Sequence, residues 1–240
     1  MEWMQKKTVG ASMVGSDEGL SVIGAFQIVE DALTEYFASL GIDGVTVKKK
    51  YGAFWVFVKS RVRVFKRLLW NEDYSVTACI SFISLAKLHV DVCVRDKSGD
   101  KAFDARVELC LLDIEKQRIK RIADIGIDKS MLTSGEIADI AFGGFGAETL
   151  PTVEQVRVRS TNIDHSHHTN NLEYFRFIMN TYTVAELEAK TVREAEIVYL
   201  SQSYEGDLLD VQKEAHEDRD LFVLQKDGKP VVKCEIVFKE

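Results

Sequence analysis

Apolar residues recur three and four positions apart between Ile23 and Leu40, as they do along one face of a helix. The pattern runs through Phe26, Val29 and Leu33, and glycine follows at position 41, where a helix C-cap glycine belongs. The pattern therefore predicts a long helix over residues 23–40.

Extended segments follow this helix. Runs rich in β-branched and aromatic residues occupy positions 54–58, 61–66, 74–82, 88–95 and 103–113. Turn-forming residues separate these runs at 71–73 and 96–100. A helix followed by several such strands predicts an α+β unit, in which the helix packs on one face of a curved antiparallel sheet.

The second half of the chain repeats this order. A helix is predicted over 170–182, and strands over 195–203, 208–215, 221–225 and 231–238. Gly99 and Gly228 occupy equivalent turns about 130 residues apart, which indicates two copies of one supersecondary unit. We expect an N-terminal repeat over 1–116, a connector with a short helix over 117–152, and a C-terminal repeat over 153–240.

Composition narrows the class of protein. The net charge of -7 is unlike that of a general nucleic-acid binder. No run of about 18 apolar residues occurs, and residues 1–7 lack an apolar segment with a cleavage site, so we expect a cytoplasmic protein without a membrane span. The cysteines stand singly in strand-like segments, which predicts buried free thiols at Cys79, Cys93, Cys110 and Cys234.

Positive charge is concentrated in a few stretches. These contain Lys48, Lys49, Lys50, Arg61, Arg63, Lys66, Arg67, Lys116, Arg118, Lys120 and Arg121. One interpretation is solvated edge strands, whose charges discourage pairing with other chains. The other is a landing surface for an acidic partner protein.

A polar motif precedes the second predicted helix. Three of the five histidines fall within four residues there, at His165, His167 and His168. The first turn of a helix offers unpaired N–H groups that stabilise an oxyanion. Histidine can activate water near neutral pH, and a nearby carboxylate such as Asp164 can fix its tautomer.

Three interpretations of the motif remain open at this point. The imidazoles could bind a metal, with further ligands undetermined. The segment could be a structural cap, with Thr169 or Asn170 as the N-cap residue. The third interpretation is catalysis, in which His168 is the base.

The motif resembles one in the acyl-acyl carrier protein thioesterases of plants and bacteria. In that family, Asp-x-Asn-x-His-Val-Asn-Asn precedes the central helix of the second of two hot-dog repeats, and here the run is Asp164-His165-Ser166-His167-His168-Thr169-Asn170-Asn171. The sequence continues with Leu172-Glu173-Tyr174, much as the family continues with an apolar residue and tyrosine. Residues 28–35, 57–67 and 111–116 also resemble family segments.

The resemblance implies a fold of two tandem hot-dog repeats and hydrolysis of the thioester of fatty acyl-acyl carrier protein, without a cofactor or a metal. His168 falls on the family's catalytic histidine and Asp164 on its aspartate. Ser166 falls on the catalytic asparagine. This position departs from the family, because a hydroxyl has one hydrogen-bond donor where an amide has two. Asn170 and Asn171 are the candidate substrate-binding residues. Plant members carry glutamate and cysteine after the helix; Gln202 and Ser203 lie nearest those positions, and neither role is transferred.

The expected partners are an acidic acyl carrier protein, through its phosphopantetheine arm, and a fatty acyl chain held by a monomer or a homodimer. Phe26, Val29 and Leu33 are candidate pocket walls, and an ordinary core role explains them equally well. Alternative functions are an acyl-CoA thioesterase, a hot-dog dehydratase, or a non-catalytic acyl- or metal-binding hot-dog protein.

Overall fold

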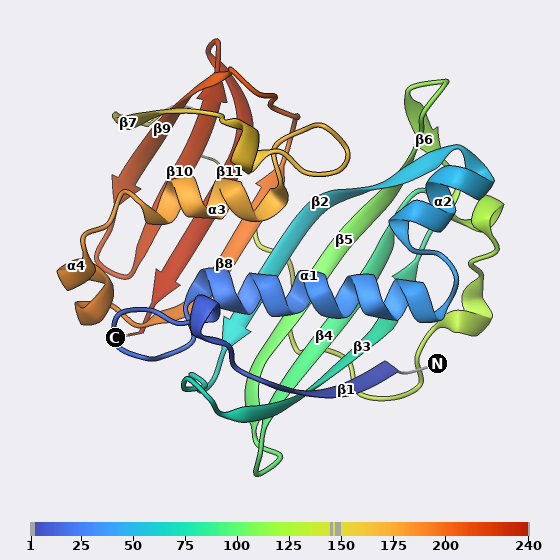
Figure 1. The fold of residues 1–240 in the computed structure, drawn as a ribbon, viewed down its shortest axis with the longest axis horizontal. Coiled ribbons are helices and arrows are strands. Elements are labelled where there is room, and N and C mark those ends of the chain that lie inside the picture. The colour runs from blue at the N-terminus through green and yellow to red at the C-terminus, as the bar shows by residue number, and fades with distance from the viewer. Residues whose placement is uncertain (1–2, 145, 147–149, 240) are drawn as a thin grey trace. The chain divides into compact units, whose positions relative to one another are not determined.

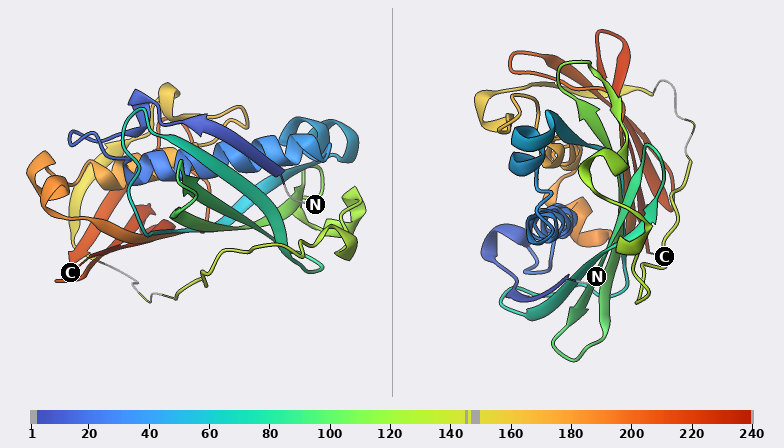
Figure 2. Two further views of the ribbon diagram at one scale, coloured as in Figure 1. Left: turned by 90° about the horizontal axis from the view of Figure 1, so that it is seen from below. Right: turned by 90° about the vertical axis from the view of Figure 1, so that its right-hand side faces the viewer.

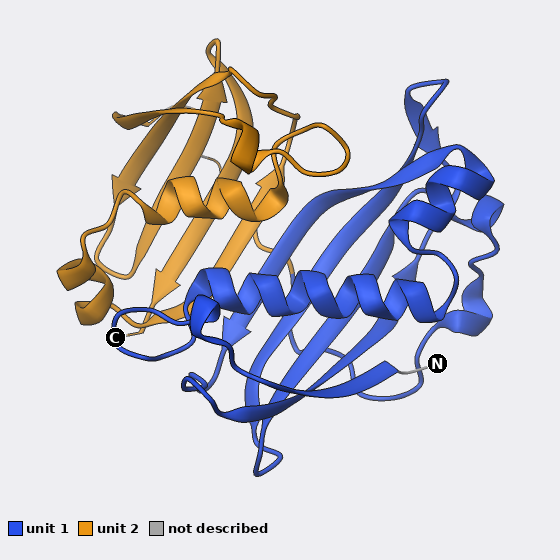
Figure 3. Cartoon of the chain, in the orientation of Figure 1, with its two compact units in different colours: residues 1–141 blue, residues 142–240 orange. Residues whose placement is uncertain are grey.

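The computed structural model describes residues 3–144, 146 and 150–239. The chain forms two compact units, Met1–Ala141 and Phe142–Glu240 (Figure 3). Residues 145 and 147–149 of the expected connector, and residues 1 and 2, lie outside the described residues. The repeat boundaries 1–116 and 153–240, with a connector over 117–152, stay a prediction.

The N-terminal unit is built around one long helix, α1 (Val22–Ser39) (Figure 1). Ser21 caps α1 by accepting a hydrogen bond from the Gly24 amide, and the helix then buries one apolar face. A Cβ at Gly24 would lie 2.2 Å from the Met13 carbonyl oxygen, so glycine is required where the helix meets the short 3-10 helix Ala11–Met13. A shorter helix, α2 (Gly44–Tyr51), follows.

Antiparallel strands form the sheet of this unit. Their order is β1 (Trp3–Thr8), β3 (Asp73–Ile83), β4 (Leu88–Asp96), β5 (Lys101–Asp113) and β2 (Ala53–Val64), and β6 (Arg118–Lys120) pairs with β5. The predicted strands 54–58 and 61–66 are one strand, β2, with a register shift between Phe57 and Lys59. Two further 3-10 helices follow, Ile122–Ile125 and Lys129–Met131, in the region where a short connector helix was expected.

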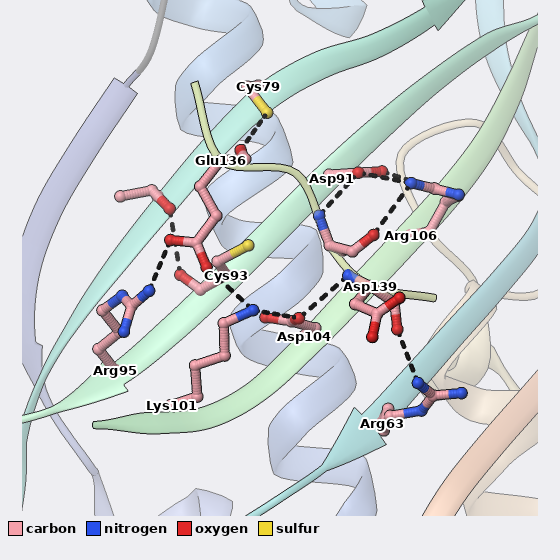
Figure 4. A network of polar contacts seen from close by, with 12 residues as sticks. Arg63, Cys79, Asp91, Cys93, Arg95, Lys101, Asp104, Arg106, Glu136 and Asp139 are labelled. Atoms are coloured by element: carbon pink, nitrogen blue, oxygen red, sulfur yellow. Dashed lines mark hydrogen bonds and ion pairs between the residues drawn. The ribbon is translucent and has the colours of Figure 1, made fainter. Parts of the chain in front are cut away.

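The two faces of this sheet differ in chemistry. The face toward α1 is apolar and includes the fully buried Ile80, Val92 and Val107. The opposite face carries Asp91, Arg106 and other polar side chains, and an extended segment that we call the strap, residues 136–141, lies across it (Figures 2 and 4). The sheet is therefore covered on both sides.

Side chains of the sheet hold the strap by its backbone. Asp91 Oδ2 accepts the Ala138 amide at 3.0 Å, and Arg106 donates to the carbonyl oxygens of Ala138 and Ile140. Asp91 and Arg106 also pair with each other through two 2.7 Å contacts (Figure 4). Arg61 and Arg63 donate to further strap carbonyls, at Ala141 and Asp139.

The C-terminal unit repeats the plan with shorter elements. Helix α3 (Asn171–Met179) buries Tyr174, Phe175, Phe177 and Ile178, and α4 (Val184–Ala189) follows it. The antiparallel sheet has the order β8 (Val192–Tyr199), β11 (Lys229–Phe238), β10 (Arg219–Lys226), β9 (Leu208–Ala215) and β7 (Thr152–Arg157). A 3-10 helix, Ser160–Asn162, precedes the polar motif. Side chains of this sheet also accept hydrogen bonds from backbone amides. Glu196 accepts one from the Gly143 amide, and Gln212 accepts one from the Leu150 amide.

The predicted fold class is confirmed, because each unit places a helix on a curved antiparallel sheet in the hot-dog manner. Gly99 and Gly228 occupy matching turns, β4–β5 and β10–β11, with left-handed φ angles of 87° and 72°. All four cysteines are buried free thiols, as predicted. No helix among the described residues is long and apolar enough to cross a membrane.

The interpretation of the basic stretches as solvated edge strands is wrong for several residues. Lys48, Lys49 and Lys50 lie in the last turn of α2, which the Asp43 cap and the left-handed Gly52 delimit. Arg61 and Arg63 hold the strap as described above. Other residues of these stretches form ion pairs: Lys66 with Asp96, Arg67 with Asp17, Lys120 with Asp113 and Arg121 with Asp124.

Candidate active site

The polar motif forms a tight loop immediately before α3. Ile163 and Thr169 pair as an isolated antiparallel bridge, and between them the Asp164 amide donates to the His168 carbonyl oxygen at 3.0 Å. His167 turns the chain with a left-handed φ of 65°, which is uncommon for a residue other than glycine. The loop thereby returns on itself and brings residues 164 and 168 together.

Asp164 and His168 are paired in this loop. Asp164 Oδ2 lies 3.5 Å from His168 Nδ1, and Asp164 Oδ1 accepts the Ser166 amide at 2.7 Å. One carboxylate oxygen is thus held by the backbone while the other faces the imidazole. A carboxylate beside Nδ1 favours the tautomer that carries its proton on Nδ1. Nε2 is then the nitrogen that can take a proton from water.

The N-terminus of α3 adjoins this pair. Asn170 is the N-cap residue, and its Oδ1 accepts the Leu172 amide at 2.8 Å. The Glu173 amide donates to the Asn170 carbonyl oxygen, and the Asn170 amide to the Asn162 carbonyl oxygen. Among the described residues the Asn171 amide has no acceptor, so it is available to an oxyanion at this helix end.

The other members of the motif are placed differently. His165 and His167 are exposed, whereas Ser166 and His168 are partly buried. The described part of the chain contains no group of three or more histidine, cysteine, aspartate or glutamate side chains arranged to hold a metal ion. The loop therefore brings together Asp164, Ser166 and His168 from the predicted set, and its end presents Asn170 and Asn171.

A buried hydroxyl cluster, which no sequence pattern indicates, adjoins the loop. Thr169 Oγ1 lies 2.7 Å from Ser203 Oγ, which lies 2.9 Å from Tyr174 Oη. In the sequence, position 203 is distinguished only by its nearness to the position of the plant cysteine. Its neighbour Gln202 is exposed and accepts a hydrogen bond from the Tyr204 hydroxyl at 3.0 Å.

This arrangement suits attack of water on a carbonyl carbon. A histidine supported by a carboxylate can deprotonate water, and a free amide at a helix N-terminus can stabilise the resulting oxyanion. No covalent nucleophile is needed for such a reaction. Asp164 and His168 are 16% and 20% exposed, so a substrate can reach them.

Comparisons with known proteins bear on the same residues. The family model described as the acyl-ACP thioesterase N-terminal domain, where ACP is acyl carrier protein, matches residues 1–128. The model of the acyl-ACP thioesterase C-terminal domain matches residues 147–240, which include the motif. No curated protein matches the chain.

Solved structures share the fold. An acyl-ACP thioesterase from Bacteroides thetaiotaomicron is 16% identical with a TM-score of 0.89, over 99% of this chain and 98% of that chain. The 12:0-ACP thioesterase from Umbellularia californica is 17% identical with a TM-score of 0.83, over 99% of this chain and 97% of that chain. At this level of identity the likeness concerns the architecture alone.

Proposed function

Since the chain belongs to the acyl-ACP thioesterase family and hydrolyses the thioester of fatty acyl-ACP, we propose that Asp164, Ser166 and His168 carry out this reaction. The products are a free fatty acid and holo-ACP, and the reaction ends fatty acid synthesis on the carrier. The observation that supports the assignment is the 3.5 Å pairing of Asp164 with His168 beside the open amide of Asn171.

In the proposed mechanism His168 is the general base. Asp164 holds the Nδ1 side of the imidazole, and Nε2 takes a proton from a water molecule as its oxygen attacks the thioester carbonyl carbon. The carbonyl oxygen becomes an oxyanion in the tetrahedral intermediate. When the intermediate collapses, the C–S bond breaks and the imidazolium returns its proton to the departing phosphopantetheine sulfur.

Charge on the oxyanion is stabilised by donors at the start of α3. The Asn171 amide supplies one hydrogen bond, and the positive end of the helix dipole adds to it. The Ser166 hydroxyl supplies a second donor or orients the water, with one donor where the family's asparagine has two. Asn170 fixes this helix end through its cap and borders the thioester.

The test compares two histidines of the same loop. His168→Ala should lower kcat on acyl-ACP by about 10²–10⁴-fold, the usual worth of a general base, while the exposed His165→Ala should stay close to wild type. Product is measured as free fatty acid from a mixed acyl-ACP pool. Acyl-CoA and 3-hydroxyacyl substrates run in parallel. Turnover of His168→Ala like that of the wild type would exclude the assignment.

The basic end of α2 is proposed as a landing surface for the acidic carrier. Lys48, Lys49 and Lys50 are exposed and form no ion pair with a described residue. The Ile114 amide donates to the Gly52 carbonyl oxygen, which brings the exposed Lys116 of the β5–β6 turn and Arg118 of β6 to the same region. We expect a cytoplasmic enzyme that works as a monomer or a homodimer.

A further inference from the structure

Three buried hydroxyl groups meet next to the motif loop, and each comes from a different segment. Thr169 precedes α3, Tyr174 lies within α3, and Ser203 follows β8. Ser203 is fully buried, and Thr169 and Tyr174 are 2% and 3% exposed. Buried hydroxyls without partners are costly, so their hydrogen bonds decide what the cluster does.

One assignment of the protons uses every group once. The Ser203 amide donates to Tyr174 Oη at 3.1 Å, and the Tyr174 hydroxyl donates to Ser203 Oγ. The Ser203 hydroxyl donates to Thr169 Oγ1, which donates in turn to the Ser203 carbonyl oxygen at 3.0 Å. Each hydroxyl therefore both donates and accepts, and the cycle begins and ends on the backbone of Ser203.

The cycle ties Thr169 firmly to Ser203. The Thr169 amide adds another hydrogen bond to the Ser203 carbonyl oxygen, at 2.8 Å. Thr169 is extended, since it pairs with Ile163, and neighbouring side chains on extended backbone point in opposite directions. Holding Thr169 inward therefore sets the outward direction of His168 and Asn170 on either side of it.

We propose that the Thr169–Ser203–Tyr174 hydroxyl network is a positioning unit for His168 and Asn170. This inference rests on the proposed function of His168 as the base. Ser203 has no exposed surface with which to touch substrate, so it acts through Thr169. Burial raises the pKa of Tyr174, which keeps the donor proton that the cycle requires.

The experiment removes one hydroxyl at constant shape. Thr169→Val should lower kcat about 10- to 100-fold with KM changed less than about 2-fold, because small misplacement of a catalytic group costs turnover rather than affinity. Thr169→Ser keeps the hydroxyl and should restore most of kcat. Thr181→Val is the matched control, since Thr181 Oγ1 donates to the Ile178 carbonyl oxygen at 2.8 Å at the other end of α3.

Melting temperatures separate positioning from a merely structural role. Thr181→Val should lower the melting temperature without lowering kcat. Equal kcat for wild type and Thr169→Val, or a Thr169→Ser enzyme as slow as Thr169→Val, would overturn the inference. If Thr169→Val does not fold, Tyr174→Phe tests the same cycle and should lower kcat in the same direction.

The outcomes also separate this inference from the proposed function. If His168→Ala turned over as fast as the wild type, both the role of His168 as the base and the role of the hydroxyl network as its positioning unit would be overturned. An inactive His168→Ala enzyme beside a fully active Thr169→Val enzyme would overturn the positioning unit alone.

Discussion

Removing the carboxylate of Asp91 should destabilise the N-terminal unit more than any surface substitution. Asp91 is 1% exposed, and its oxygens accept hydrogen bonds from Ser81, from Arg106 twice and from the Ala138 amide. In Asp91→Ala all of these donors lose their acceptor. The guanidinium of Arg106, whose side chain is only 17% exposed, would be left without its counter-charge.

The loss can be sized from these contacts. Breaking one side of a buried ion pair costs about 3–5 kcal/mol, because the remaining charge stays desolvated. Arg106 keeps its bonds to the strap carbonyl oxygens, which limits the loss to that range. Asp91→Asn also removes the negative charge and turns one acceptor oxygen into an NH2 donor that faces other donors, so it should cost a similar amount, about 3–5 kcal/mol.

Fluorescence offers an assay of this unit alone. All three tryptophans, Trp3, Trp55 and Trp70, lie in the N-terminal unit. Urea unfolding followed by tryptophan emission therefore reports the free energy of unfolding of the part that contains Asp91. The matched control is Asp124→Ala, which breaks the exposed pair with Arg121 and should cost less than about 1 kcal/mol.

Two patterns of unfolding free energies would contradict the stabilising role of the Asp91–Arg106 pair. If Asp91→Ala and Asp124→Ala unfold with the same free energy, the Asp91–Arg106 pair under the strap stabilises the unit no more than an exposed pair does. A loss for Asp91→Asn much smaller than that for Asp91→Ala would show that the number of acceptors, and not the charge of Arg106, sets the cost.

Two further predictions concern charge. Burial raises the pKa of Glu108, but hydrogen bonds from Lys87 and His89 outweigh this effect and leave the pKa below its ordinary value of 4.5. The ionised Glu108 therefore stabilises the folded protein above pH 4.5, and this stabilisation is lost as the pH falls through the lower pKa of the folded state. Glu108→Gln should flatten the acid decline of the urea midpoint below about pH 4.5, and an unchanged decline would contradict this. Replacing Lys48, Lys49 and Lys50 of α2 by glutamate should lower kcat/KM for acyl-ACP about 10-fold at low salt and leave acyl-CoA turnover unchanged. High salt should remove this loss, because it screens surface charge, and a loss that persists in high salt would contradict docking by charge.

Long apolar patterns explain why most of the fold could be predicted. The spacing through Phe26, Val29 and Leu33 leaves one interpretation over 18 residues, and α1 is confirmed. Helix α2 was missed because its lysines hide a short apolar face with only Val47 buried, and its ends depend on Asp43 and Gly52. Strands β1 and β7 were missed because most of their residues are exposed, which leaves no alternation to detect.

The site was predictable only where it is local in sequence. Asp164 and His168 are four residues apart, so a motif contains both. Ser203 is separated from Thr169 by 34 residues, and nothing in either neighbourhood indicates that their hydroxyls meet. Such a contact is created by the return of the chain through α3 and β8, which periodicity does not specify.

The way the strap is held has a consequence for sequence divergence. Asp91, Arg61, Arg63 and Arg106 bind its amides and carbonyl oxygens, which every residue type except proline provides. Exposed strap positions such as 137 and 139 are thus free to change between relatives, whereas the anchors on the sheet are not. Glu136, which pairs with Arg95 and Lys101, and the buried Ala138 and Ile140 are constrained by their own side chains, so the strap can change at alternate positions and still dock in the same place.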